Sequence, residues 1–114
     1  MGVPREKPIQ NAIIRYLNLI PGCMAVTYYN GAVFNPTRQR FQKAGLDRPN
    51  GFPDIIGVFH GRAFAIEVKS PTGRLSPAQK LVHKKMEDKG WPVGVCRSVD
   101  EAASFIASLR APVV

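Results

Sequence analysis

The chain has 114 residues, of which 45% are hydrophobic and 21% charged, a composition that indicates a globular protein and excludes a disordered one. This length allows one hydrophobic core but not two, so we expect a single domain over residues 1–114. Lysine and arginine number 16 against 8 aspartates and glutamates, which gives a formal net charge of +8. Such an excess of positive charge indicates a polyanionic partner, most often nucleic acid.

The cysteines and the apolar runs exclude several other classes of protein. Cys23 and Cys96 are too few for a disulfide framework or for a zinc site, which uses about four ligands. Cys96 lies in an apolar run, which predicts a buried thiol. Every apolar run is too short for a signal peptide or a membrane span, so we expect a reducing, cytoplasmic setting and no membrane partner.

The first part of the chain is expected to form a helix, a strand and a loop. Apolar residues recur at helical spacing over residues 5–20, which predicts an amphipathic helix that ends at Pro21-Gly22. Residues 24–29 are typical of a strand, and Asn30-Gly31 predicts a turn after it. Residues 35–50 mix turn residues with basic ones, which predicts a long loop or a short broken helix.

The second part is expected to complete a sheet. Short apolar runs at residues 55–59 and 63–68 predict buried strands, and the polar turn His60-Gly61-Arg62 predicts that they pair as an antiparallel hairpin. A helix over residues 76–88 and a strand over 93–97 follow, and such a strand–helix–strand crossover implies a parallel pair. We therefore expect an α/β fold with a mixed four-stranded sheet flanked by helices.

Two helix starts carry the pattern of a capping box. Ser76 is expected to cap the helix before the last strand, with Gln79 closing the box. Ser98-Val99-Asp100-Glu101 repeats the pattern at the start of a last helix. His83 is expected to be exposed among helix lysines and His60 to lie in the hairpin turn, so neither is expected to bind a metal.

Three charged residues are expected to converge at one edge of the sheet. Glu67 and Lys69 are two residues apart, so they would point to the same face of a strand. Asp54 precedes the first strand of the hairpin and would lie across from the end of the second. Ionised groups are rarely placed among buried strands unless they are paired or bind a metal.

This constellation predicts a site for phosphodiester chemistry. Asp54 and Glu67 offer the hard oxygen ligands that suit Mg²⁺ or Mn²⁺, and the backbone carbonyl of Val68 would supply a third contact. Such a metal would polarise a phosphodiester oxygen and lower the pKa of a bound water, while Lys69 would stabilise the developing negative charge. The alternative is an ordinary Glu–Lys pair on a solvated strand face, with Ile66 and Val68 as the core residues.

Pro53-Asp54, followed thirteen positions after the aspartate by Glu67-Val68-Lys69, resembles the PD-(D/E)XK nuclease signature. The strings GFPDIIG at 51–57, IEVK at 66–69, GRLSPAQ at 73–79 and GVCRSVDEA at 94–102 narrow the resemblance to the VRR-NUC branch of the restriction-endonuclease-like superfamily. Within this branch, the chain resembles in particular the small stand-alone proteins found in phages and bacteria. The resemblance implies a restriction-endonuclease-like core and a nuclease of a bacterial or phage-infected cell.

The resemblance also implies roles for particular residues. Asp54 and Glu67 would be metal ligands and Lys69 the catalytic lysine. An acidic residue on the first helix would lie near the site, and Glu6 matches it; the alternative is an acid that merely favours the first turn of a helix. Gln79 matches a family position that faces the active site, and the alternative is that it only completes the capping box.

The segment between residues 7 and 53 contains a single acid, Asp47, and therefore suits a phosphate clamp. The residues expected to contact DNA are Asn30, which resembles a polar family position, and the basic side chains of Arg38, Arg40, Lys43 and Arg48. The alternative is a solvated loop. Nothing resembles a base-reading motif, so any specificity should be for DNA shape.

Together these observations predict a DNA endonuclease that depends on Mg²⁺ or Mn²⁺. Because cutting two strands needs two sites, a homodimer is the economical arrangement, and a four-way junction or other branched DNA is the leading substrate. Single-stranded or flapped DNA comes next. The alternatives are a non-catalytic nucleic-acid-binding module and a nuclease subunit that is active only with a partner.

Overall fold

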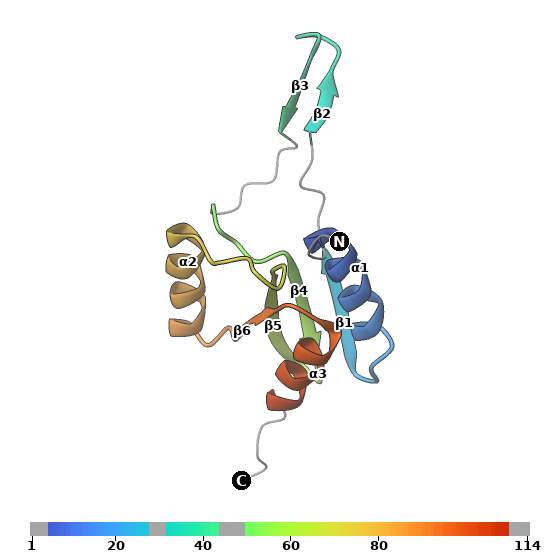
Figure 1. Cartoon of the computed structure of the whole chain (residues 1–114), viewed down its shortest axis with the longest axis vertical. Coiled ribbons are helices and arrows are strands. Elements are labelled where there is room, and N and C mark those ends of the chain that lie inside the picture. The colour runs from blue at the N-terminus through green and yellow to red at the C-terminus, as the bar shows by residue number, and fades with distance from the viewer. Residues whose placement is uncertain (1–4, 28–31, 44–49, 110–114) are drawn as a thin grey trace.

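The computed structural model describes residues 5–27, 32–43 and 50–109, with the backbone alone for 32–35 and 40–43 (Figure 1). The elements are, in chain order, α1 (Glu6–Leu17), β1 (Cys23–Thr27), β2 (Ala32–Asn35), β3 (Arg40–Lys43), β4 (Ile55–Phe59), β5 (Arg62–Val68), α2 (Pro77–Asp88), β6 (Val93–Cys96) and α3 (Val99–Ser108). None of the helices in these ranges is both long and apolar enough to cross a membrane.

The main sheet confirms the predicted mixed architecture. It has four strands in the order β1-β4-β5-β6. β4 pairs antiparallel with both β1 and β5, and β5 pairs parallel with β6 through the crossover helix α2. The fold class is α/β, with helices on both faces of a restriction-endonuclease-like sheet.

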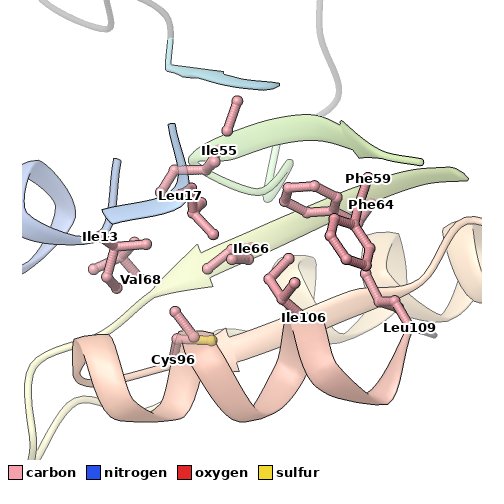
Figure 2. Close-up of a cluster of buried hydrophobic side chains, with 12 residues drawn as sticks. Ile13, Leu17, Ile55, Phe59, Phe64, Ile66, Val68, Cys96, Ile106 and Leu109 are labelled. Atoms are coloured by element: carbon pink, nitrogen blue, oxygen red, sulfur yellow. The ribbon is translucent and has the colours of Figure 1, made fainter. Parts of the chain in front are cut away.

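The larger core lies between the sheet and the two helices α1 and α3. Figure 2 shows its labelled side chains: Ile13, Leu17, Ile55, Phe59, Phe64, Ile66, Val68, Cys96, Ile106 and Leu109. Alternate strand residues point to this face, and each such side chain contributes roughly 1.5–3 kcal/mol on burial. Gly57 makes room for the ring of Phe64, because a Cβ at Gly57 would lie 2.5 Å from a ring carbon.

The opposite face of the sheet is covered only in part. Val82 and Met86 of α2 pack on Ala65 of β5, and Glu67 lies on this same face two residues later. On the strands farther from α2, Met24 and Val26 remain exposed. The helix α2 therefore encloses Glu67 but leaves the outer half of the sheet open.

The expectation of a long loop or broken helix at residues 35–50 is wrong for its first part. β2 and β3 form a separate antiparallel hairpin there, with Asn35 paired to Arg40 (Figure 1). Four residues connect the strands, and Gln39 adopts a positive φ of 52° within that connection. The turn residues thus reverse the chain between two very short strands, which a search for longer apolar runs does not detect.

The helix starts follow local chemistry. The capping box of Ser76 and Gln79 is present at α2, as predicted. At α3 the expected second box is incomplete: the Oγ of Ser98 accepts from the N–H of Glu101, but the Glu101 carboxylate accepts from the N–H of Arg97 rather than from Ser98. Pro8 is tolerated because α1 begins at Glu6, so Pro8 falls in the first turn, where no helical N–H has a partner.

Candidate active site

The pairing of β4 with β5 brings Asp54 and Glu67 together. Ile55 pairs with Ile66, so the residue before β4 lies beside the end of β5. The Oδ2 atom of Asp54 accepts a hydrogen bond of 2.8 Å from the backbone N–H of Val68. The carboxyl group of Asp54 also lies close enough to that of Glu67 to raise its pKa. The predicted convergence of the two acids is therefore present in the structure.

The backbone of Asp54 is anchored from two sides. The Thr27 hydroxyl at the end of β1 donates to the carbonyl of Asp54 at 3.0 Å, and the Gln10 amide of α1 donates to that hydroxyl at 2.6 Å. On the other side, Gly51 has a φ of +93°, and a Cβ there would lie 2.6 Å from the backbone carbonyl of Ala78 in α2. Glycine therefore lets the loop before Asp54 pack directly against the start of α2.

Glu67 is the most unusual group in the site, because only 2% of this acidic residue is exposed. Burial, as the largest cause, and the neighbouring carboxyl group of Asp54 together raise the pKa of Glu67 to about 9. The charge of Lys69 acts in the opposite direction. Ile66 and Val68 are core residues, but the alternative of a solvated Glu–Lys pair is wrong because Glu67 is buried as well.

His83 also belongs to this site, and the expectation that it is exposed is wrong. Only 7% of His83 is exposed, and its Nε2 atom lies 3.1 Å from Oε1 of Glu67. Burial lowers the pKa of His83 below its usual value. Its position follows from helical spacing with Gln79, Val82 and Met86, a signal that the lysines on either side of it obscure.

Lys69 and Glu6 are placed within electrostatic reach of Glu67. Lys69 follows β5 directly, is half-buried, and its backbone N–H donates to the carbonyl of Cys96 at 3.1 Å, which extends the parallel ladder. Its positive charge lowers the pKa of Glu67, whereas the charge of Glu6 at the start of α1 raises it. Both residues thus lie close enough to shift the pKa of the buried Glu67.

Gln79 fulfils the capping role predicted for it. Its Oε1 atom accepts from the N–H of Ser76 at 2.9 Å, and the Ser76 hydroxyl accepts from the N–H of Gln79 at 3.1 Å. The cap uses the carbonyl oxygen of the side chain and not its NH₂ group. Gln79 precedes His83 by one helical turn, so an additional role at the active site stays a prediction.

The family model of the VRR-NUC domain matches residues 37–100, which is more than half of the chain and includes Asp54, Glu67, Lys69 and Gln79. The chain belongs to the VRR-NUC domain family. It is thus a nuclease-type domain that acts on DNA. No curated protein matches the chain.

The two acids of this VRR-NUC domain suit a divalent cation. Among the residues that the structure describes, no group of three or more His, Cys, Asp or Glu side chains is arranged to hold a metal. Mg²⁺, however, keeps several waters and requires only one or two protein carboxylates. The pKa of Glu67, which lies beside Asp54, is about 9, so its carboxyl group holds a proton at neutral pH. A cation bound between the two acids would take the place of that proton. The predicted contact of the Val68 backbone carbonyl with the metal stays a prediction.

The predicted phosphate clamp is described only in part. Arg38 is exposed in the connection between β2 and β3. Arg40 and Lys43 lie on β3, for which the backbone alone is described. Asn30 and Arg48 fall outside the described residues. The clamp therefore stays a prediction for all of them.

Proposed function

We propose that this VRR-NUC domain is a metal-dependent DNA endonuclease that hydrolyses phosphodiester bonds at Asp54, Glu67 and Lys69. The observation that carries the proposal is the burial of Glu67 next to Asp54 and within reach of the Lys69 charge. Burying one acid next to another that raises its pKa, as Asp54 does for Glu67, is costly for a fold. The placement of this pair beside a lysine in a domain of net charge +8 suits a phosphate substrate and a cation.

Mg²⁺ or Mn²⁺ bound by Asp54 and Glu67 would polarise the phosphate and lower the pKa of a bound water. The protein's own residues then have separate tasks. Asp54 is held in place by the N–H of Val68, so its carboxylate faces the end of β5 in one orientation. Lys69 stabilises the negative charge that develops on the phosphate oxygens as water attacks in line with the leaving oxygen. The enclosure of Glu67 beneath α2 keeps bulk water from screening these charges.

We propose supporting roles for the remaining predicted residues. Glu6 contributes a third acid at the edge of the site, since its charge already acts on Glu67. Gln79 contributes its side-chain NH₂ group, which the capping box does not use. The basic residues predicted to bind DNA phosphates outside the site are Arg38, Arg40, Lys43 and Arg48, with Asn30 as a polar contact.

We propose branched DNA, with the four-way junction first, as the substrate of a homodimer. One chain carries one such site, and the two incisions that resolve a junction need two. The exposed apolar side chains of Met24, Val26 and Val58 on β1 and β4 support association, because contiguous apolar patches are typical of protein–protein contacts. Sedimentation velocity with and without DNA tests the dimer, and a monomer on junction DNA would contradict it.

Two other functions remain as competitors. A non-catalytic nucleic-acid-binding module would gain nothing from a buried acid that must be kept protonated or neutralised, so Glu67 argues against it. A nuclease subunit active only with a partner would bind metal but would not turn over by itself. The same cleavage assay distinguishes both of these alternatives from the proposed endonuclease.

The assay uses labelled four-way junction, flap, single-stranded and duplex DNA, each with Mg²⁺, with Mn²⁺ and with a chelator. Cleavage that requires the metal and is lost in Lys69→Ala is the expected result. The preferred DNA structure identifies the substrate. Binding of DNA without cleavage under any metal would contradict the proposal and favour the binding module, or the partner-dependent subunit if the protein still binds metal.

A further inference from the structure

A histidine on the crossover helix α2 contacts the buried acid of the site. The Nε2 atom of His83 and the Oε1 atom of Glu67 are 3.1 Å apart, and the exposed fractions of the two residues are 7% and 2%. The neighbours of His83 on this face of α2 are apolar, namely Val82 and Met86. A polar ring at such a position is costly to bury unless it makes a hydrogen bond, and Glu67 is the group it meets.

Glu67 is thereby held between two elements of the fold. Asp54, which the N–H of Val68 holds beside the end of β5, lies next to its carboxyl group, and His83 contacts it from α2. A glutamate side chain has three rotatable bonds, so contacts from two directions restrict the orientation of its carboxyl group far more than one does.

The helix that carries His83 is itself fixed relative to the site. The capping box of Ser76 and Gln79 defines its first turn. Gly51, in the loop that leads to Asp54, packs so closely on this turn that a Cβ would lie 2.6 Å from the Ala78 carbonyl. The same helical turn therefore sets the position of the Asp54 loop and the starting point of the helix that presents His83.

A histidine suits this position better than the residues around it on the helix. A neutral imidazole adds no charge beside the acids, whereas a lysine in its place would compete with a bound cation. An apolar side chain would pack but would leave Oε1 of Glu67 buried without this partner. In metal sites, partners of this kind orient the ligand, and their loss typically weakens metal binding by about 10–100-fold.

We infer that His83 is a positioning residue that holds the Glu67 carboxyl group in the orientation in which it binds the catalytic metal. The inference deepens the proposed function and rests on it. His83 touches neither substrate nor metal in this role; it acts through Glu67.

The test compares metal binding, cleavage and stability in purified protein. Mn²⁺ binding without DNA is measured from the free Mn²⁺ signal in electron paramagnetic resonance, and cleavage is followed as a function of Mn²⁺ concentration. The variants are His83→Leu, which keeps volume without a hydrogen-bonding group, and His83→Gln, whose amide nitrogen can take the place of Nε2. Met86→Leu is the control, because Met86 lies on the same buried face of α2 and does not hydrogen bond to Glu67.

The expected result is a loss of Mn²⁺ affinity of about 10–100-fold in His83→Leu, with a matching rise in the Mn²⁺ concentration that supports half-maximal cleavage. Affinity in His83→Gln should recover toward that of the wild type. Met86→Leu should retain wild-type affinity even if its melting temperature falls. A merely structural histidine would lower the melting temperature of His83→Leu without changing its metal affinity, and that outcome would overturn the inference.

If His83→Leu does not fold, His83→Gln and His83→Asn carry the test, because the asparagine amide nitrogen falls at the place of Nδ1 and is too short to reach Glu67. Equal Mn²⁺ affinity in these two variants would then overturn the inference. A wild-type protein that binds no Mn²⁺ and cuts no DNA would overturn the proposed function and the inference together. If the wild-type protein binds Mn²⁺ and cuts DNA, and a folded His83→Leu has the same Mn²⁺ affinity and cleavage, only the inference about His83 is overturned and the proposed function stands.

Discussion

The backbone N–H of Val68 donates a 2.8 Å hydrogen bond to Oδ2 of Asp54, and this bond ties the acid before β4 to the strand that carries the second acid. The two residues are fourteen positions apart in the sequence, so the bond forms only when the β4–β5 hairpin closes in the observed register. Because Glu67 directly precedes Val68, the same register sets the spacing of the two acids. Closure of the hairpin in this register therefore brings the two acids of the site together.

Replacement of Lys69 by alanine is expected to lower the cleavage rate by about 10²–10³-fold, because it removes the cation that stabilises charge on the phosphate. DNA binding should fall only slightly, since one of 16 basic side chains is lost. Single-turnover cleavage and fluorescence anisotropy measure the two effects separately. Lys85→Ala is the matched control, because Lys85 is exposed near the end of α2. Equal rates in both variants would exclude a catalytic role for Lys69.

The buried acid predicts how stability depends on pH in the absence of metal. The pKa of Glu67 is raised to about 9 from 4.5, so the folded state binds its proton more tightly than the unfolded state does. Its contribution to stability is complete below about pH 4.5 and is lost as pH rises through 9. The free energy of unfolding should therefore fall over this window, by at most about 1.4 kcal/mol per pH unit.

Glu67→Gln should remove this dependence, because glutamine does not titrate. Urea unfolding in the presence of a chelator at pH 5, 7 and 9 measures it. Asp88→Asn is the control, since Asp88 is an exposed acid paired with Lys84 on α2, and it should keep the wild-type slope. A wild-type slope in Glu67→Gln would show that another group causes the pH dependence.

The two roles of Gln79 can be separated by mutating each half of the capping box. Ser76→Ala removes the acceptor of the Gln79 N–H, and Gln79→Ala removes the acceptor of the Ser76 N–H, so each should lower the free energy of unfolding by about 1 kcal/mol. If the Gln79 NH₂ group acts at the site, only Gln79→Ala should also lower the cleavage rate at saturating metal. Chemical denaturation and single-turnover kinetics provide the comparison. Equal cleavage in the two variants would leave Gln79 with its capping role alone.

Local patterns in the sequence were sufficient to predict much of this fold. Two short apolar runs and the polar turn between them predicted the β4–β5 hairpin, and Ser76 with Gln79 predicted the start of α2. The β2–β3 hairpin was missed because its strands have four residues each and lie among turn residues. β6 also has four residues, but it lies in a short apolar run, whereas β3 contains a single apolar residue, Phe41.

The candidate site was predictable to the extent that its residues lie at strand ends. Asp54 and Glu67 could be placed together because hairpin geometry brings the start of one strand to the end of the next. His83 could not be placed in this way, since its partner is sixteen positions away and on another element. Its helical spacing with Val82 and Met86 would have predicted burial, but not the contact with Glu67.

The loop before Asp54 yields a last prediction, which concerns Gly51. A Cβ at Gly51 would lie 2.6 Å from the Ala78 carbonyl, and the φ of +93° is strained for any residue with a side chain. Gly51→Ala should therefore displace the loop, lower the free energy of unfolding by more than about 1 kcal/mol and reduce cleavage by moving Asp54. Gly61→Ala separates strain from contact, because Gly61 has a φ of +79° and nothing lies within 4 Å of its Cβ position. This control should lose stability by a similar strain but retain cleavage; if both variants cleave alike, packing of Gly51 on α2 does not position Asp54.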